Sequence, residues 1–270
     1  MRTAPAPSST APVAVVTGAA RGIGLGIAEW FLAQGWRVAA WDNDAATLAD
    51  GARTLEAAAP GRVLALHCDV SQPADVDSAT ARTAAHFGRI DALVNNAGVA
   101  TFKPTLDTSF AEWRTVMATN LDGAFLCTQA VAPVMLKTGG GAVVNIASIS
   151  GLRASTLRVA YGTSKAALIH LTKQHATELG TVGIRVNAIA PGPVETEMAK
   201  KVHSEAIRRD YFAVIPLARY GEIAEIASAV GFLCSPAAGY INGQVLAVDG
   251  GFDGAGVGLP TLRETPRPGA

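Results

Sequence analysis

The stretch Val13-Ala-Val-Val-Thr-Gly-Ala-Ala-Arg-Gly-Ile-Gly24 decides the fold. Val13 to Val16 is a continuous apolar run, and continuous runs are typical of parallel strands that are covered on both faces. Gly18 permits a tight turn after this strand, and Ile23 to Gln34 has the apolar spacing of a helix. The stretch therefore predicts a strand, a glycine-rich turn and a helix, which together open a βαβ unit.

Six further apolar runs follow, with helical patterns between them. The runs span Arg37 to Trp41, Val63 to His67, Ala92 to Val94, Ala142 to Ile146, Arg185 to Ile189 and Val245 to Val248. The helical patterns span Ala45 to Ala58, Ala74 to Phe87, Phe110 to Lys137, Val159 to Leu179 and Ile223 to Cys234. Alternating strands and helices predict an α/β fold, in which a doubly wound, parallel, seven-stranded, Rossmann-like sheet carries helices on both faces.

The sequence predicts a single domain with a short segment at each end and one insertion. Residues 1–12 are rich in Pro, Ser and Ala, and we expect a disordered lead. We expect residues 13–253 to form this domain. Within it, residues 191–217 are bounded by prolines and contain a polar helical stretch from Glu197 to Tyr211, which predicts a lid. Residues 254–270 are rich in Gly and Pro and are expected to form a tail.

Composition excludes several classes of protein. The 270 residues carry 22 basic and 22 acidic side chains, so no excess of positive charge indicates a nucleic-acid or membrane partner. The three cysteines are far apart and form no C-x-x-C motif, which favours a reducing cytoplasm over a disulfide framework. The histidines show no metal-ligand spacing, and no apolar window is long enough to span a membrane.

The glycine-rich turn predicts a dinucleotide site. Gly22 and Gly24 let the backbone approach a pyrophosphate at the start of a helix. Asp42 ends the second apolar run 24 residues after Gly18, where a carboxylate binds the ribose hydroxyls of NAD and repels the 2′-phosphate of NADP. Arg21 is the counter-indication, because a guanidinium there pairs with a 2′-phosphate. The alternatives are a turn without a ligand and an Asp42 that only caps a helix, although Asp44 can fill that role.

Polar residues follow the third and fourth runs as well. Asp69-Val70 ends the third run, and Asn95-Asn-Ala-Gly98 ends the fourth. Doubly wound sheets bind ligands at this edge. Each of these segments alone is also typical of an ordinary turn.

A third group of polar residues lies between Ser148 and Lys165. Tyr161 and Lys165 are four residues apart, so a helix places them one turn apart on one face. Ser148 ends the fifth apolar run, so a hydroxyl, a phenol and an ammonium can meet at the sheet edge. Taken singly, each has a structural interpretation: a packed ring, a solvated lysine and a turn serine, with Ser150 as a competitor for the role of Ser148.

With these motifs in order, the chain from Val13 to Gly251 resembles the short-chain dehydrogenase/reductase family. The motifs are Thr17–Gly24, Asp69, Asn95–Gly98, Asn120, Ser148, Tyr161-x-x-x-Lys165, Pro191-Gly192 and Val248-Asp-Gly-Gly251. The resemblance implies hydride transfer between a nicotinamide cofactor and a secondary alcohol or ketone, and assembly as a homotetramer. The cofactor contacts implied are Gly18, Arg21, Gly22, Ile23, Gly24, Asp42, Asp69, Val70, Asn96, Ala97, Gly98, Tyr161, Lys165, Pro191, Gly192, Val194 and Thr196.

The resemblance also implies a role for each catalytic residue. Tyr161 is the general acid/base, and Lys165 holds the nicotinamide ribose and favours the phenolate. Ser148 hydrogen-bonds the substrate oxygen, and Asn120 orders a water that leads protons to bulk solvent. Val194 and Thr196 bind the carboxamide of the nicotinamide. Because free tyrosine titrates near pH 10, we expect Lys165 to lower the pKa of Tyr161 by about 1–3 units.

The substrate is left open by the sequence. Pocket candidates are Ile149 to Leu157, Thr101, Phe102 and the segment Glu195 to Tyr211. Arg153 and Arg158 either meet a carboxylate or phosphate or lie solvated at the surface. Relatives that share these motifs act on sugars and polyols, acyl thioesters, steroids or hydroxy acids. Two other functions stay open: a dinucleotide sensor without turnover, and an NAD-dependent epimerase or dehydratase.

Overall fold

The computed structural model describes residues 11–256, in which seven parallel strands form one sheet in the order β3-β2-β1-β4-β5-β6-β7. The strands are β1 (Val13–Thr17), β2 (Arg37–Asp42), β3 (Val63–His67), β4 (Ala92–Asn95), β5 (Gly141–Ile146), β6 (Ile184–Pro191) and β7 (Val245–Val248). The chain winds outward from β1 to β3 and then restarts at β4 on the other side of β1. This order confirms the doubly wound sheet, whose ligand crevice lies at the carboxyl ends of β1 and β4.

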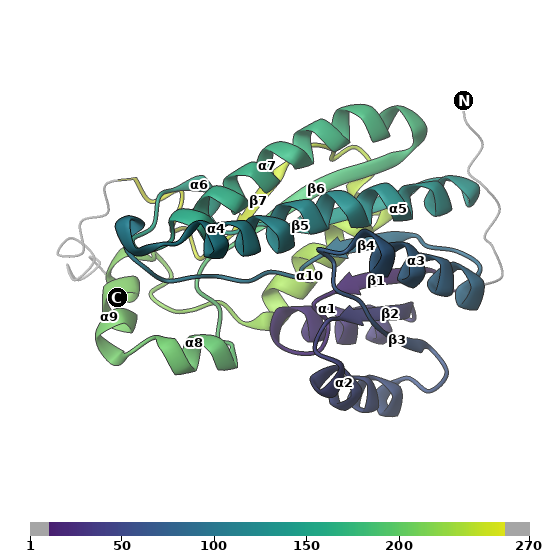
Figure 1. Cartoon of the computed structure of the whole chain (residues 1–270), viewed down its shortest axis with the longest axis horizontal. Helices are drawn as coiled ribbons and strands as arrows, with labels where there is room; N and C mark the ends of the chain where they lie inside the picture. Colours follow the sequence, from purple (N-terminus) through teal and green to yellow (C-terminus); the bar gives the residue numbers. More distant parts are fainter. Residues whose placement is uncertain (1–10, 257–270) are drawn as a thin grey trace, which may run out of the picture.

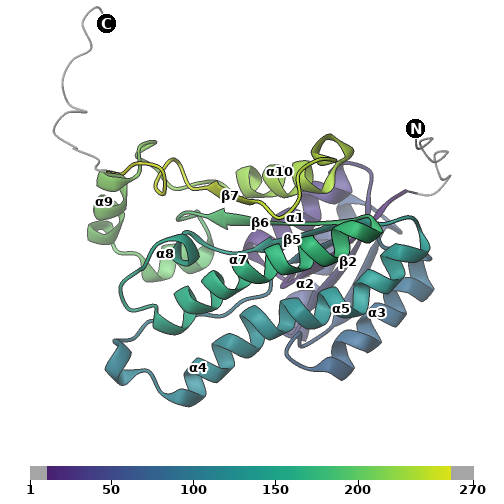
Figure 2. The ribbon, with the colours of Figure 1, turned by 90° about the horizontal axis from the view of Figure 1, so that it is seen from above.

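Helices cover both faces of the sheet (Figure 1). One face is covered by α1 (Gly22–Ala33), α2 (Ala45–Ala58) and α10 (Ile223–Cys234). The other is covered by α3 (Pro73–Phe87), α5 (Gly123–Lys137) and α7 (Val159–Leu179). Each layer packs a separate apolar core against the strands, which explains why the strands are continuous apolar runs. Figure 2 shows the two layers from above.

The helix expected from Phe110 to Lys137 is interrupted. The structure has α4 (Phe110–Met117), one π-helical turn, η2 (Ala118–Asp122), and then α5. The turn places Asn120 in the interior, where it is 1% exposed and hydrogen-bonded to other segments. Tertiary contacts of one side chain therefore override the regular helical spacing, as is common where π turns serve functional sites.

The polar stretch from Glu197 to Tyr211 is not one helix either. It forms α8 (Glu197–Val202) and α9 (Glu205–Val214), which are separated by an extended His203. The break follows from capping, because Ser204 accepts a hydrogen bond from the backbone N–H of Ile207 and starts a new helix. Both helices lie at the same end of the molecule as α4 (Figures 1 and 2).

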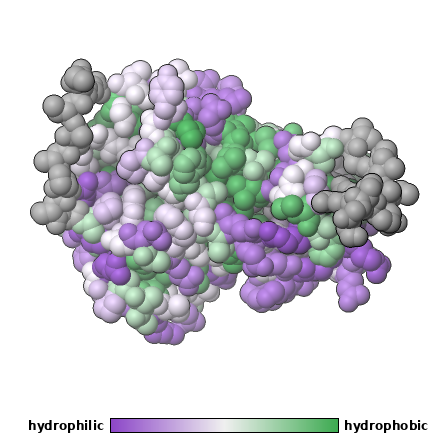
Figure 3. All heavy atoms as spheres, turned by 180° about the vertical axis from the view of Figure 1, so that it is seen from behind, coloured by the Kyte–Doolittle hydropathy of each residue, from purple (hydrophilic) through white to green (hydrophobic). Residues whose placement is uncertain are grey.

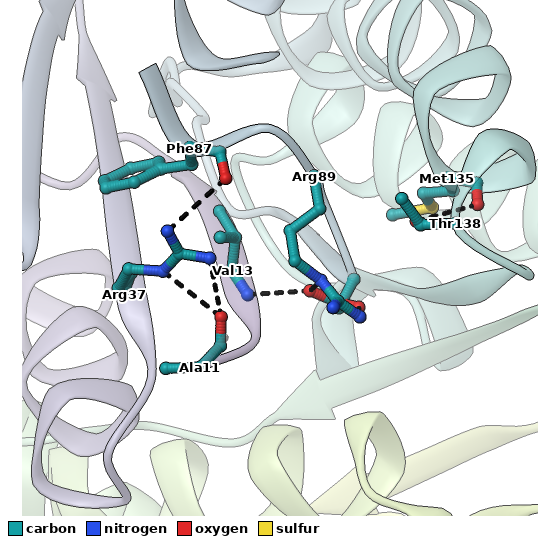
Figure 4. A network of polar contacts seen from close by, with 8 residues as sticks. Ala11, Val13, Arg37, Phe87, Arg89, Met135 and Thr138 are labelled. Carbon is teal, nitrogen blue, oxygen red and sulfur yellow. Dashed lines mark hydrogen bonds and ion pairs between the residues drawn. The ribbon is translucent and has the colours of Figure 1, made fainter. Parts of the chain in front are cut away.

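The amino edge of the sheet is held by a network around the start of β1 (Figure 4). The backbone N–H of Val13 donates to Asp91, 2.8 Å away, and Arg89 pairs with the same carboxylate. The guanidinium of Arg37 donates to the carbonyls of Ala11 and Phe87. These bonds fix where the chain enters the sheet, at the edge opposite the ligand crevice.

Two of the expectations concern residues that the structure does not describe. The lead over residues 1–12 and the tail over residues 254–270 fall outside residues 11–256, apart from the residues next to each boundary. Within the described part, no helix combines the length and the apolar character needed to cross a membrane. The described chain also contains no group of three or more His, Cys, Asp or Glu residues able to hold a metal ion.

Candidate active site

The turn between β1 and α1 has the shape of a dinucleotide cradle. Gly18 and Gly22 adopt φ of +64° and +58°, a region that favours glycine. A Cβ on Gly24 would lie 2.1 Å from the carbonyl oxygen of Gly18, so only glycine fits there, whereas a Cβ on Gly22 would meet nothing within 4 Å. Helix α1 begins without a side-chain cap or an acidic residue in its first turn. Its free N–H groups beside open space fit a pyrophosphate.

The loop after β4 braces this cradle. The Asn96 side-chain amide donates to the carbonyls of Thr17, at 2.9 Å, and Gly18, at 3.1 Å. The Thr17 hydroxyl accepts from the backbone N–H groups of Asn96 and Ala97, both at 3.0 Å. The structure thus joins two motifs that the sequence places far apart. The bracing role of Thr17 was missed, although its position at the strand end inside the glycine motif was a usable signal.

Asp42 stands beside the cradle and does not cap the next helix. One carboxylate oxygen accepts from Ala20 N, at 2.9 Å, and the other from Asp44 N, at 2.9 Å. Asp44 is the N-cap of α2, since it accepts from the backbone N–H of Thr47. Arg21 pairs with Asp44 at 3.1 Å in an exposed ion pair. The helix-cap interpretation of Asp42 is therefore wrong, and its carboxylate is held at the end of β2.

Asp69 and Val70 follow β3 at the same edge. The Asp69 carboxylate accepts from the backbone N–H of Ser71, at 2.9 Å, and from its hydroxyl, at 2.8 Å. Val70 is 6% exposed and packs on Gly123 so closely that a Cβ on that glycine would lie 2.7 Å from Val70 Cγ2. The structure places both residues in the turn after β3, next to the start of α5. The hydrogen bonds of the Asp69 carboxylate are to Ser71 in the same turn.

The segment after β6 carries the remaining cofactor candidates. Pro191 ends β6, and Gly192 N donates to the carbonyl of Val248 at 3.0 Å. Val194 is buried and forms a bridge with Gly221. The Thr196 hydroxyl is the N-cap of α8, where it accepts from Ala199 N at 3.1 Å. This segment therefore connects the sheet edge with the two helices that follow.

Ser148 and Tyr161 meet at the carboxyl end of β5. Ser148 is buried and caps α6 (Ile149–Leu152) by accepting from Ser150 N at 3.1 Å. Its side chain also lies close enough to the Tyr161 phenol to counter part of the effect of burial on the pKa of that phenol. Ser150 does not compete, because its hydroxyl is bonded to Ser155, at 2.9 Å, and Arg158, at 3.2 Å.

Lys165 lies below Tyr161 in the interior. Its ammonium donates to the carbonyl of Ile146 at 2.7 Å and lies 5.8 Å from the centroid of the Tyr161 ring. Lys165 is only 3% exposed, and burial lowers its pKa to about 8. The ammonium is thus held at the end of β5, one helical turn from the phenol, as the four-residue spacing predicts.

The pKa of Tyr161 corrects one expectation. Burial raises the pKa of Tyr161 above its usual value, and the hydrogen bond with Ser148 and the positive charge of Arg158 oppose that rise. We had expected Lys165 to lower it. Burial of the phenol is the largest influence on the pKa of Tyr161, and the Lys165 ammonium is bonded to the carbonyl of Ile146.

Asn120 is bonded to the helix that carries Tyr161 and Lys165. Its amide accepts from Val99 N, at 2.8 Å, and donates to Val99 O and Ser164 Oγ, both at 2.9 Å. The Ser164 hydroxyl donates to the carbonyl of Tyr161 at 2.7 Å. The bridging role of Ser164 was missed, although it stands directly before Lys165 in the motif.

Asn120 and Lys165 also converge on one point. A Cβ on Gly98 would lie 3.3 Å from Asn120 Oδ1 and 3.4 Å from Lys165 Nζ, so the two polar groups flank this glycine. The structure therefore brings together all four residues that the sequence motifs nominated. They come from the π turn, the end of β5 and α7, beside the cradle after β1.

The buried ammonium gives a prediction about stability. Because the folded-state pKa of Lys165, about 8, lies below the unfolded value of 10.5, the folded chain releases this proton first as the pH rises. The stability cost of the buried charge is present below pH 8 and fades between pH 8 and 10.5. Relative to Lys165→Met, the native chain should therefore gain about 2 kcal/mol in unfolding free energy between pH 7 and 10.

Urea denaturation of both proteins at the two pH values measures this difference. Comparing the two proteins cancels the titration of the tyrosines and cysteines that they share. A difference that stays constant with pH would contradict a buried, charged Lys165.

A cradle for a pyrophosphate at the switch point of a doubly wound sheet, next to a Ser–Tyr–Lys–Asn cluster, defines the class of dinucleotide-dependent oxidoreductases. Residues 18–253 match a family model described as enoyl-(acyl carrier protein) reductase. The chain belongs to the short-chain dehydrogenase/reductase family. Members of this family use nicotinamide cofactors, and the chain is an oxidoreductase that acts on CH–OH donors.

Several named relatives are similar over nearly the whole chain. A 2-(R)-hydroxypropyl-CoM dehydrogenase of Xanthobacter autotrophicus is 45% identical, covering 89% of this chain and 98% of the relative. A D-threitol dehydrogenase of Mycolicibacterium smegmatis is 43% identical, with 89% and 92% covered. The crystal structure of levodione reductase superimposes with a TM-score of 0.86 at 36% identity, with 91% and 99% covered.

Proposed function

We propose that this chain transfers a hydride between NAD and a secondary alcohol or ketone, with Tyr161 as the general acid/base. One observation carries the proposal. The Tyr161 phenol lies next to Ser148, with Lys165 one helical turn away and Asn120 beside Lys165, at the switch point of the sheet. The names of the similar proteins, which refer to hydroxyalkyl, polyol and ketone compounds, agree with this substrate class.

Each residue of the cluster then has a chemical task. When bound, the nicotinamide supplies the hydride acceptor or donor, held by the glycine cradle and Asp42. Tyr161 removes the hydroxyl proton of the alcohol, or returns it to the carbonyl oxygen in the reverse direction. Ser148 donates a hydrogen bond to the same oxygen and stabilises its developing charge. Lys165, whose ammonium lies one helical turn from Tyr161, holds the ribose of the nicotinamide.

Proton release from Tyr161 is the step that the other polar groups support. Burial alone works against ionisation, so the phenolate depends on positive charge and hydrogen bonds in its neighbourhood. Asn120 is tied to Val99 and, through Ser164, to the backbone of Tyr161. We assign it to the path by which the proton leaves, through a water held at the π turn. The segment 191–217 then acts as the lid over the substrate.

Asp42 supports NAD over NADP. Its carboxylate stands at the end of β2, and the guanidinium of Arg21 is paired with Asp44 and bonded to Thr47. We expect kcat/KM with NAD to exceed that with NADP by at least about 10-fold, because a 2′-phosphate meets two carboxylates. Asp42→Ser should reduce this preference. An equal or greater rate with NADP in the native enzyme would contradict it.

A screen of secondary alcohols with NAD tests the proposed activity. Formation of reduced nicotinamide is followed by absorbance, with sugars, polyols, hydroxy acids and hydroxyacyl thioesters as substrates. We expect the enzyme to oxidise a member of one of these substrate classes. The Tyr161 variant described in the Discussion should lose this activity. NAD binding without oxidation of any alcohol or reduction of any ketone would contradict the proposal.

The exposed apolar surface of the chain supports assembly as a homotetramer. Phe110 and Leu106, beside α4, are 77% and 97% exposed, and Leu246 on β7 is 41% exposed. On the face seen from behind, apolar atoms gather in a central band (Figure 3). Exposed apolar surface of this kind is typical of subunit contacts. Light scattering measures the oligomeric state, and a monomer would contradict the proposed tetramer. A cytoplasmic location also stays a prediction.

A further inference from the structure

Arg158 lies where the three candidate pocket segments meet. Its guanidinium donates to Ser150 Oγ at 3.2 Å and to the hydroxyl of Tyr211 at 3.4 Å. It also lies over the ring of Phe102, 5.1 Å from the centroid. Ser150 belongs to α6, Tyr211 to α9 and Phe102 to the loop after β4. Arg158 thus contacts all three segments that the sequence nominated separately as pocket candidates.

The contacts of Arg158 leave its charge uncompensated. They consist of two neutral hydroxyl groups and an aromatic face, and no ion pair within residues 11–256 includes it. Glu195, an acidic residue of the lid segment, is already in a bidentate pair with Arg208. Arg158 is half-buried. A partly buried charge normally has an opposite partner, because the desolvated charge is costly alone.

Arg153 provides an internal comparison. It is exposed, its guanidinium donates to the carbonyl of Phe252 at 2.8 Å, and it stacks on the ring of the same residue. Arg153 borders the same hollow as Arg158, but its guanidinium is already held by the carbonyl and the ring of Phe252. Of the two arginines that the sequence left open, only Arg158 lies near Tyr161, from which it is three residues away.

We infer that Arg158 binds an anionic group, a carboxylate or a phosphate, on the same molecule that presents its hydroxyl or carbonyl to Tyr161. This inference rests on the proposed function. A guanidinium binds such groups through two parallel hydrogen bonds, and Arg158 has the donors to do so once a neutral hydroxyl gives way. A hollow of about 510 Å³, lined by Arg158 and Ser150 among others, leaves room beside the guanidinium. Ser148 and Tyr161 do not line this hollow, and Arg158, whose charge acts on the Tyr161 phenol, is the residue that relates the hollow to the reacting groups.

Matched ketones test the charge requirement. Acetoacetate and acetoacetamide differ in the charge of one group, and acetonyl phosphate and hydroxyacetone form a second pair. For the native enzyme loaded with NAD, which cannot reduce a ketone, we expect one of the anions to bind about 10- to 100-fold more tightly than its neutral counterpart, measured by calorimetry. The ratio of kcat/KM values for the same pair should show the same preference. The preferred pair distinguishes a carboxylate substrate from a phosphate substrate.

Three variants separate binding of the anion from a structural role. Arg158→Gln should abolish the preference for the anion, so that kcat/KM falls further for the anionic ketone than for its neutral counterpart, which loses only the effect of the Arg158 charge on Tyr161. Arg158→Lys should retain part of the preference. Arg153→Gln and Tyr211→Phe should keep the native preference. An equal loss with charged and neutral ketones in Arg158→Gln, or no charge preference in the native enzyme, would overturn the inference. Reduction of neutral ketones without a charge preference refutes only this inference, whereas anion binding without turnover of any ketone refutes the proposed function.

Discussion

Replacing Tyr161 with phenylalanine is expected to lower kcat/KM by about 10²- to 10⁴-fold, the usual contribution of a general acid/base. The substitution removes one hydroxyl, which lies next to Ser148, and leaves the ring near Lys165. Binding of NAD should change little, because the cradle is built by the β1–α1 turn and the loop after β4. Steady-state kinetics gives the loss, and calorimetry gives the affinity for NAD.

Tyr240→Phe is the matched control for this experiment. The same hydroxyl is removed from a tyrosine that is fully exposed, so both activity and stability should stay at native values. Near-native turnover in the Tyr161 variant would exclude it as the acid/base. A large loss of NAD affinity would instead assign it to cofactor binding.

Replacing Gly24 with alanine is expected to abolish NAD binding at concentrations that saturate the native enzyme. The new methyl group would lie 2.1 Å from the carbonyl oxygen of Gly18 and 2.5 Å from the Asn96 amide, so the turn must open to accept it. Alanine improves helix propensity by about 1 kcal/mol over glycine. The forced displacement costs about 1–3 kcal/mol or more, so the clash outweighs that gain.

Calorimetry with NAD and urea denaturation measure the two consequences of this change. Gly254→Ala is the control, because a Cβ there would meet nothing within 4 Å. It should leave both the NAD affinity and the unfolding midpoint unchanged. A Gly24 variant that binds NAD as tightly as the native chain would show that the turn does not hold the pyrophosphate.

Much of the fold follows from local pattern. All seven strands were predicted because a sheet buried on both faces requires continuous apolar runs, such as Val13 to Val16. The two wrong helix predictions have separate causes, because the break before α9 follows from local capping by Ser204, whereas the π turn follows from tertiary contacts. The π turn at Asn120 depends on partners in two distant segments, Val99 and Ser164, and no local spacing encodes a contact of that kind.

The sequence predicted the parts of the site in which residues of a suitable chemical type follow the end of a strand. Ser148, Tyr161, Lys165 and the glycine turn follow from motifs, since the carboxyl ends of parallel strands share one edge. The pKa of Tyr161 was not predictable, because it depends on how deeply the phenol is buried. The different surroundings of Arg158 and Arg153 could not be predicted from the sequence either. Arg158 contacts Phe102 and Tyr211, whereas Arg153 contacts Phe252, and all of these contacts are made between distant parts of the chain.

The bonds that anchor Ala11 and Val13 have a practical consequence for how the enzyme can be attached to a surface or fused to another protein. The chain enters β1 at the amino edge, and the five residues of that strand, about 16 Å at 3.3 Å per residue, separate this point from the glycine turn. A tag, dye or sensor-chip linkage placed ahead of Ala11 therefore starts on the side away from the crevice. An attachment after residue 256 starts close to Phe252, which Arg153 contacts beside the substrate loop. Immobilisation through the amino end is the orientation that leaves the substrate entrance open.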